Sequence, residues 1–222
     1  AMVCVDGVAY APHRNIDLQE LDVDFYVFSF YKVYGPHYSV LYCRKDILEK
    51  LPGINHFFIG KQELPYKLQP GNINFELSYS LLGIIDYFKE LNVHHEGDAS
   101  DRIRKVSQQI YDPIADHEEE ISAPLLSFLR EKKGVRIIGE ERASKDARVP
   151  TISFVSEKMR SDDIPVLVDP HKIGIRYGDF YARRLIEDLG LSEKNGVVRV
   201  SMVHYNAMHE VNRLIEILDN IL

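Results

Sequence analysis

A lysine and an aspartate, each directly after a short apolar segment, are the residues of this sequence best suited to chemistry. Lys32 follows the aromatic and β-branched run 25–31, and Asp6 follows residues 2–5. An amine buried at the end of a strand loses its charge easily, and an uncharged amine can condense with an aldehyde. A carboxylate at a second strand end can keep the nitrogen of a bound aromatic ring protonated. A lysine and a carboxylate are thus the residue types that a site binding an aldehyde covalently would use.

Three short extended segments position these groups, at residues 2–5, 25–28 and 40–43. Their nearly continuous apolarity predicts strands covered on both faces, as in an α/β sheet. A loop rich in turn formers follows at 52–71, and apolar residues at helical spacing predict a helix over 75–91. We expect a hinge at 94–98, so that residues 1–96 form part of one domain.

Residues 97–222 predict a second, smaller α+β domain. A helical pattern covers 100–133, where Pro113 and Pro124 are expected to kink or divide the helix. Short strands are expected at 135–138, 151–155, 173–176 and 197–202, with helical segments between them. The last helix is expected to open after Asn206, a residue that caps helix N-termini well.

Composition restricts the function classes. The chain has 222 residues, 45% of them apolar, and a formal charge of −7, which argues against nucleic-acid binding. Cys4 and Cys43 lie in apolar segments without metal-ligand spacing, so we expect buried free thiols in a reducing compartment and no metal site. No apolar run approaches the length of a membrane helix, which favours a cytoplasmic protein with no membrane partner. The abrupt start in a strand is typical of a fragment.

Several motifs, in order along the chain, resemble the class V aminotransferases, the family that includes the cysteine desulfurases. The resemblance rests on residues 5–13, 16–17, 24–25, 29–32, 35–37, 67–72, 174–178 and 198–206. It implies pyridoxal 5'-phosphate as cofactor and fold type I, with the C-terminal part of the large domain, a mostly parallel sheet with helices, followed by the smaller domain. It also implies a homodimer. The glycine-rich phosphate cradle and the residue that stacks on the cofactor ring would precede the first strand of this chain.

The same resemblance implies roles for six residues. Lys32 would form the Schiff base with the cofactor and then move a proton at the substrate α-carbon, and Asp6 would pair with the pyridinium nitrogen. The remaining roles are phosphate contacts or substrate binding: Ser29 and Tyr31 at the phosphate, Asn72 at the phosphate of the partner subunit's site, and Arg176 at the substrate α-carboxylate. The alternatives are a solvated surface lysine for Lys32, a turn cap for Asp6, aromatic packing for Tyr31 and a surface salt bridge for Arg176.

Departures from the family pattern limit the reaction. Ala9 stands where the family has Gln or His near the cofactor's phenolic oxygen, and Ser39 replaces a glycine. Residues 176–182 contain no cysteine, so a persulfide cannot form in that loop, and Asp179 adds negative charge there. The leading hypothesis is an enzyme acting on an amino acid by transamination, elimination, racemisation or desulfuration, with the fragment alone inactive. The alternative is a degenerate, non-catalytic scaffold for dimerisation or partner binding.

Overall fold

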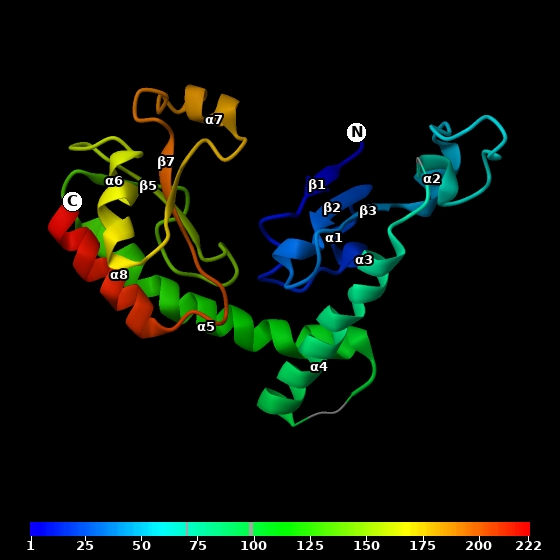
Figure 1. The fold of residues 1–222 in the computed structure, drawn as a ribbon, viewed down its shortest axis with the longest axis horizontal. Helices are drawn as coiled ribbons and strands as arrows, with labels where there is room; N and C mark the ends of the chain where they lie inside the picture. Colours follow the sequence, from blue (N-terminus) through cyan, green and yellow to red (C-terminus); the bar gives the residue numbers. More distant parts are fainter. Residues whose placement is uncertain (70, 98–99) are drawn as a thin grey trace. The chain divides into compact units, whose positions relative to one another are not determined.

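The computed structural model describes residues 1–69, 71–97 and 100–222, which form two compact units, Ala1–Asp112 and Pro113–Leu222. The boundary between the two units falls within the long helix α5 (Ile103–Glu131) (Figure 1). The predicted domain boundary after residue 96 stays a prediction.

The first unit contains a three-stranded mixed sheet in the order β1-β2-β3 (Figure 1). Strand β1 (Cys4–Asp6) runs parallel to β2 (Phe25–Ser29), with Asp6 opposite Val27, and β3 (Ser39–Cys43) is antiparallel to β2. Because β1 has a single neighbour among the described strands, Cys4 is exposed and the prediction that it is buried was wrong. The parallel pairing brings the carboxyl ends of β1 and β2 to one edge.

A tight turn leads from β2 into β3. It contains the 3₁₀ helix η1 (Phe30–Lys32), and the Phe30 carbonyl accepts hydrogen bonds from the backbone N–H groups of Val33 and Gly35. The Phe30 N–H donates to the Tyr38 carbonyl at 2.8 Å, which closes the turn. The residues that the sequence assigns to chemistry around Lys32 therefore stand on a hydrogen-bonded turn at one end of the sheet.

The helices of the first unit agree in part with the sequence patterns. They are α1 (Leu18–Leu21), α2 (Lys45–Lys50), η2 (Tyr66–Leu68), α3 (Phe75–Ser80) and α4 (Leu82–Glu96). The single helix predicted over 75–91 is interrupted at Leu81, while Ile84 and Phe88 are buried on one face, as the spacing indicates. Asn74 caps α3, because its side-chain oxygen accepts from the Leu77 N–H at 2.8 Å.

Helix α5 runs without a break through Pro113 and Pro124, so of the two predicted outcomes, a kink or a division, the division was wrong. Each proline removes one helix hydrogen bond. The helix is held by the apolar stripe that it buries, which includes Ile110 and Ile114 near the first proline and Leu125 beside the second. Tertiary burial outweighs the local effect of proline here.

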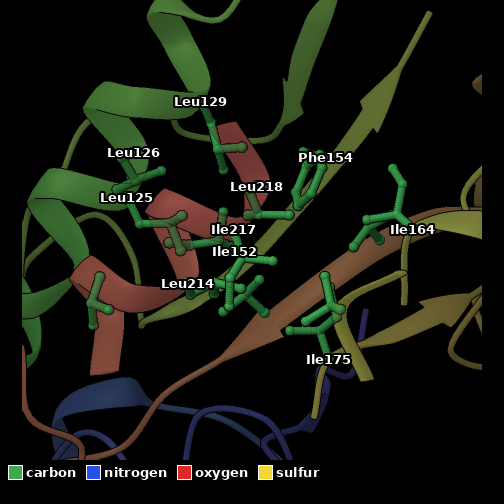
Figure 2. Packing of buried hydrophobic residues seen from close by; sticks show 14 of the residues in the cluster. Leu125, Leu126, Leu129, Ile152, Phe154, Ile164, Ile175, Leu214, Ile217 and Leu218 are labelled. Atoms are coloured by element: carbon green, nitrogen blue, oxygen red, sulfur yellow. The ribbon is translucent and has the colours of Figure 1, made fainter. Parts of the chain in front are cut away.

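The second unit packs helices on an antiparallel sheet of order β4-β5-β7-β6 (Figure 1). Its elements are β4 (Val135–Ile138), β5 (Thr151–Ser156), α6 (Asp163–Val168), η3 (Asp169–His171), β6 (Arg176–Gly178), α7 (Arg183–Asp188), β7 (Val197–Ser201) and α8 (Met208–Ile221). Figure 2 shows the core, where α5 and α8 meet β5 through Leu125, Leu129, Leu218 and Phe154. Complete burial of each such side chain contributes about 1.5–3 kcal/mol.

Two boundaries in the second unit differ from the predictions. The third strand covers 176–178 rather than 173–176, because its pairing register is set by β7. Asn206 is not the N-cap of α8: its side-chain oxygen accepts from Val203 N–H, and the Glu210 carboxylate accepts from Ala207 N–H, both at 2.9 Å. None of the helices in the described ranges is both long enough and apolar enough to span a membrane.

Candidate active site

Asp6 and Lys32 stand at the same edge of the first sheet, since Asp6 ends β1 and Lys32 lies three residues beyond the end of the parallel strand β2. Open α/β sheets bind ligands at the carboxyl ends of their strands. The Val8 N–H donates to Asp6 Oδ1 at 3.0 Å, so this carboxylate also caps the turn after β1. One of the two carboxylate oxygens of Asp6 therefore has the alternative role of a turn cap.

Lys32 is exposed, which corrects the expectation of a buried amine. The turn η1 takes the chain out of the sheet after Ser29, and the described residues leave the lysine uncovered. Its Nζ lies 6.0 Å from the centre of the Tyr31 ring. An exposed amine at a strand end is accessible to a carbonyl ligand.

Gly7 fixes the backbone directly after Asp6. It is buried, its N–H donates to the Val27 carbonyl at 2.9 Å, and a Cβ at this position would lie 2.0 Å from the Tyr26 hydroxyl oxygen. Only glycine fits this contact. Burial raises the pKa of Tyr26, and its hydroxyl has no hydrogen-bond partner within the described residues. The position of Asp6 thus depends on a close contact between backbone and ring.

Hydroxyl groups gather beside the lysine. Ser29 and Ser39 are cross-strand partners, and their Oγ atoms lie 3.0 Å apart. Tyr31 is exposed, and its ring centre lies 5.0 Å from that of His37, so it takes part in a ring contact as well as presenting a hydroxyl. Hydroxyl donors in such a group are suited to an anion.

Asn72 is exposed in the loop that leads to α3, and the preceding residues of that loop are anchored by Lys67. The Lys67 side chain is fully buried, and its Nζ donates to the backbone carbonyls of Glu49 at 3.1 Å and Leu51 at 2.9 Å. These carbonyls lie at the end of α2. The lysine therefore ties the loop before Asn72 to that helix.

In the second unit, Arg176 lies directly opposite Arg199 across the β6–β7 pair. Arg176 is exposed, and its Nη1 donates to the Ile175 carbonyl at 3.0 Å. The Arg199 guanidinium lies 3.7 Å from the centre of the Phe180 ring, and its Nε is buried with no hydrogen-bond partner in the described part of the chain. Burial lowers the pKa of Arg199.

Two cations opposite each other on a sheet repel, and a planar guanidinium can bind a carboxylate through two hydrogen bonds, so this pair is suited to an anion. Sequence reasoning assigned a role to Arg176 but none to Arg199. The available signal was an arginine between Val198 and Val200 in an otherwise apolar strand. Those valines face the core, which places Arg199 on the opposite face of the sheet.

The loop after β6 holds a large side chain in solvent at a strained position. Phe180 and Tyr181 have φ values of 50° and 66°, a region that non-glycine residues rarely adopt. The Tyr181 N–H donates to Asp179 Oδ1 at 3.0 Å, and the Tyr181 side chain is fully exposed. Asp179 thus holds the loop backbone, in addition to contributing charge.

The chain resembles one family in sequence and in structure. The family model of the class V aminotransferases matches residues 1–111 and 99–214. The aminotransferase-like protein FGM3 of Gibberella zeae is 41% identical over the whole chain and 52% of its own length. The cysteine desulfurase-like protein ustD of Aspergillus flavus is 34% identical, covering 99% of the chain and 47% of the relative.

Solved structures agree with the sequence matches. The cysteine desulfurase CsdA of Escherichia coli superimposes with a TM-score of 0.73 at 26% identity, covering 99% of this chain and 51% of that one. The predicted α/β fold of the fold type I enzymes is thereby confirmed. The chain spans about half the length of the curated relatives it matches. It belongs to the class V aminotransferases, a family that depends on pyridoxal 5'-phosphate.

Proposed function

We propose that this chain provides the lysine and the substrate-binding arginines of a pyridoxal-phosphate-dependent enzyme that acts on an amino acid. The observation that carries the proposal is the shared sheet edge of Asp6 and Lys32, which follows from the parallel pairing of β1 with β2. Lys32 is the residue that would attach the cofactor as a Schiff base, and its amine would afterwards move a proton at the substrate α-carbon.

The donor set fits the cofactor. It combines an accessible amine, a carboxylate at the neighbouring strand end and a pair of hydroxyls at Ser29 and Ser39. When bound, pyridoxal phosphate supplies an aldehyde that joins amino groups and a protonated ring that withdraws electrons from the α-carbon. Asp6 would hold the ring nitrogen protonated, while Ser29 and Tyr31 would donate to the phosphate.

For the substrate, we propose that Arg199 and Arg176 bind the α-carboxylate. A planar guanidinium binds a carboxylate through two hydrogen bonds, and the buried Nε of Arg199 has a donor without a partner in the described residues. Because residues 176–182 contain no thiol, sulfur transfer to this loop is not part of the proposal. Transamination, elimination and racemisation all use the same binding groups.

A homodimer is part of the proposal, because Asn72 would reach the phosphate in the partner subunit's site. Asn72 is exposed, as are the nearby Phe75 and Tyr79 of the α3 segment. Exposed aromatic side chains of this kind are typical of protein interfaces. We also propose a cytoplasmic location, which the free thiols Cys4 and Cys43 support.

Titration of the full-length protein with pyridoxal phosphate tests the proposed function. We expect an absorbance band near the edge of the visible range that Lys32→Ala abolishes. Lys61→Ala, which changes another exposed lysine of the first unit, should leave the band unchanged. A wild-type protein that gives no band would contradict the enzyme proposal and favour the non-catalytic scaffold.

A further inference from the structure

The turn between β2 and β3 carries an imidazole that the roles proposed above leave unused. His37 is exposed, and its ring centre lies 5.0 Å from that of Tyr31, with the ring planes at 56°. Tyr31 in turn lies beside Lys32, whose Nζ is 6.0 Å from the Tyr31 ring centre. The imidazole is therefore linked through one aromatic ring to the lysine that would attach the cofactor.

His37 also belongs to the same short turn as the hydroxyl pair. Ser39 lies two residues after it, and the Ser39 Oγ is 3.0 Å from that of Ser29. The Phe30–Tyr38 backbone hydrogen bond of 2.8 Å fixes the two arms of this turn relative to each other. Three hydroxyls and one imidazole, from Ser29, Tyr31, His37 and Ser39, thus stand on one hydrogen-bonded support.

Charge indicates what the imidazole could do. A phosphate monoester carries a charge between about −1.5 and −2 at neutral pH, whereas serine and tyrosine hydroxyls are neutral donors. The Lys32 amine cannot neutralise this phosphate while it is bonded to the aldehyde of the same cofactor. In residues 29–43, His37 and Lys32 are the two side chains that can carry positive charge.

We propose that His37 donates an N–H to the cofactor phosphate and, when protonated, offsets part of its charge. The inference rests on the proposed function and extends it by one binding residue. Neutral imidazole has one N–H and imidazolium has two, so the contact forms in either state and is stronger in the charged one. The ring contact with Tyr31 would hold the imidazole in place for this task.

Comparing pyridoxal phosphate with pyridoxal, which lacks the phosphate, isolates the proposed contact. For each full-length variant we would measure both dissociation constants from the absorbance of the adduct at Lys32. The ratio of the dissociation constant for pyridoxal to that for pyridoxal phosphate reports what the phosphate contributes to binding, and a larger ratio means a larger contribution. His37→Phe keeps an aromatic ring beside Tyr31 but removes both ring nitrogens, and it should reduce this ratio about tenfold or more. His37→Gln restores an N–H donor and should recover part of the loss.

His56 provides a matched control, because it is also an exposed histidine of the first unit in ring contact with an aromatic residue, Phe58, at 5.1 Å. His56→Phe should leave the ratio unchanged. An unchanged ratio in His37→Phe would overturn the inference. If both ligands bind more weakly by the same factor, the ratio is also unchanged, and His37 then only supports the structure of the turn. If His37→Phe does not fold, His37→Ala, which also removes the N–H donor, takes its place, and an unchanged ratio in that variant would have the same meaning. Failure of the wild type to bind either ligand would instead reject the proposed function.

Discussion

At the residue scale, Arg199 has an environment that a structural role alone does not explain. Val197, two residues away on the same face of β7, is buried in a small apolar cluster, so an apolar or β-branched residue would be expected at position 199. Here it holds a partly buried guanidinium that stacks on Phe180 and lies opposite a second arginine, Arg176. Such a group loses hydration and is repelled by its neighbour, which agrees with the proposal that it binds a carboxylate.

We therefore expect Arg199→Met to separate stability from binding. The change removes a poorly hydrated cation and also a cation–π contact, so the free energy of unfolding should stay within about 1 kcal/mol of the wild type. The apparent affinity for amino-acid substrates should fall at least about tenfold. Urea unfolding and the spectral change on amino-acid addition measure the two effects.

Arg136→Met is the control for this prediction, because Arg136 is an exposed arginine on β4 of the same sheet. It should alter neither quantity. If Arg199→Met lowers stability by several kcal/mol and leaves amino-acid binding intact, the arginine serves the fold and the carboxylate role is wrong.

At the scale of elements, the candidate site depends on how strand β1 ends. Gly7 brings its backbone against the Tyr26 ring, and the same turn contains the Val8 N–H that donates to Asp6. The carboxylate is thus positioned by contacts that need no cofactor. A substitution at Gly7 should consequently change both the stability of the first unit and the position of the Asp6 carboxylate.

Gly7→Ala should destabilise the first unit by about 1–3 kcal/mol, because the added Cβ cannot be accommodated without moving a buried ring. It should also weaken cofactor binding, through displacement of Asp6. Gly83→Ala, in α4, adds a Cβ with nothing within 4 Å and should be neutral or stabilising by up to about 1 kcal/mol. Denaturant unfolding compares the two; equal stability of both variants would refute the tight contact at Gly7.

The elements also show which features a sequence can predict. Local signals were sufficient for the helix start at Phe75, the strand at 135–138 and the buried face of α4. Tertiary packing decided two others, which depend on partners distant in sequence: α5 continues through two prolines, and β6 takes its register from β7. At the start of α8 a different local contact formed, because the Glu210 carboxylate accepts from the N–H of Ala207, three residues before it.

The candidate site was predictable to a similar extent. Because residue types that chemistry requires can be recognised in a sequence, family motifs predict Lys32, Asp6 and Ser29 as site residues, and these stay predictions. The exposure of Lys32 and the pairing of Arg176 with Arg199 follow from which surfaces are covered and which strands are neighbours. Only the three-dimensional arrangement carries that information.

At the scale of the whole molecule, the chain contains two compact units, each with part of the proposed chemistry. The first has the lysine, the carboxylate and the phosphate donors, and the second has the arginine pair. The curated relatives that the chain matches are about twice as long as the chain. The role of Lys32 is the claim on which the other proposals depend.

Reductive trapping tests that claim most directly. The full-length protein is incubated with pyridoxal phosphate, reduced with borohydride, digested and analysed by mass spectrometry to locate the pyridoxyl group. The account predicts modification at Lys32 and its loss in Lys32→Ala, with the buried Lys67 unmodified. Efficient labelling of another lysine, or no labelling of the folded wild-type protein, would contradict it.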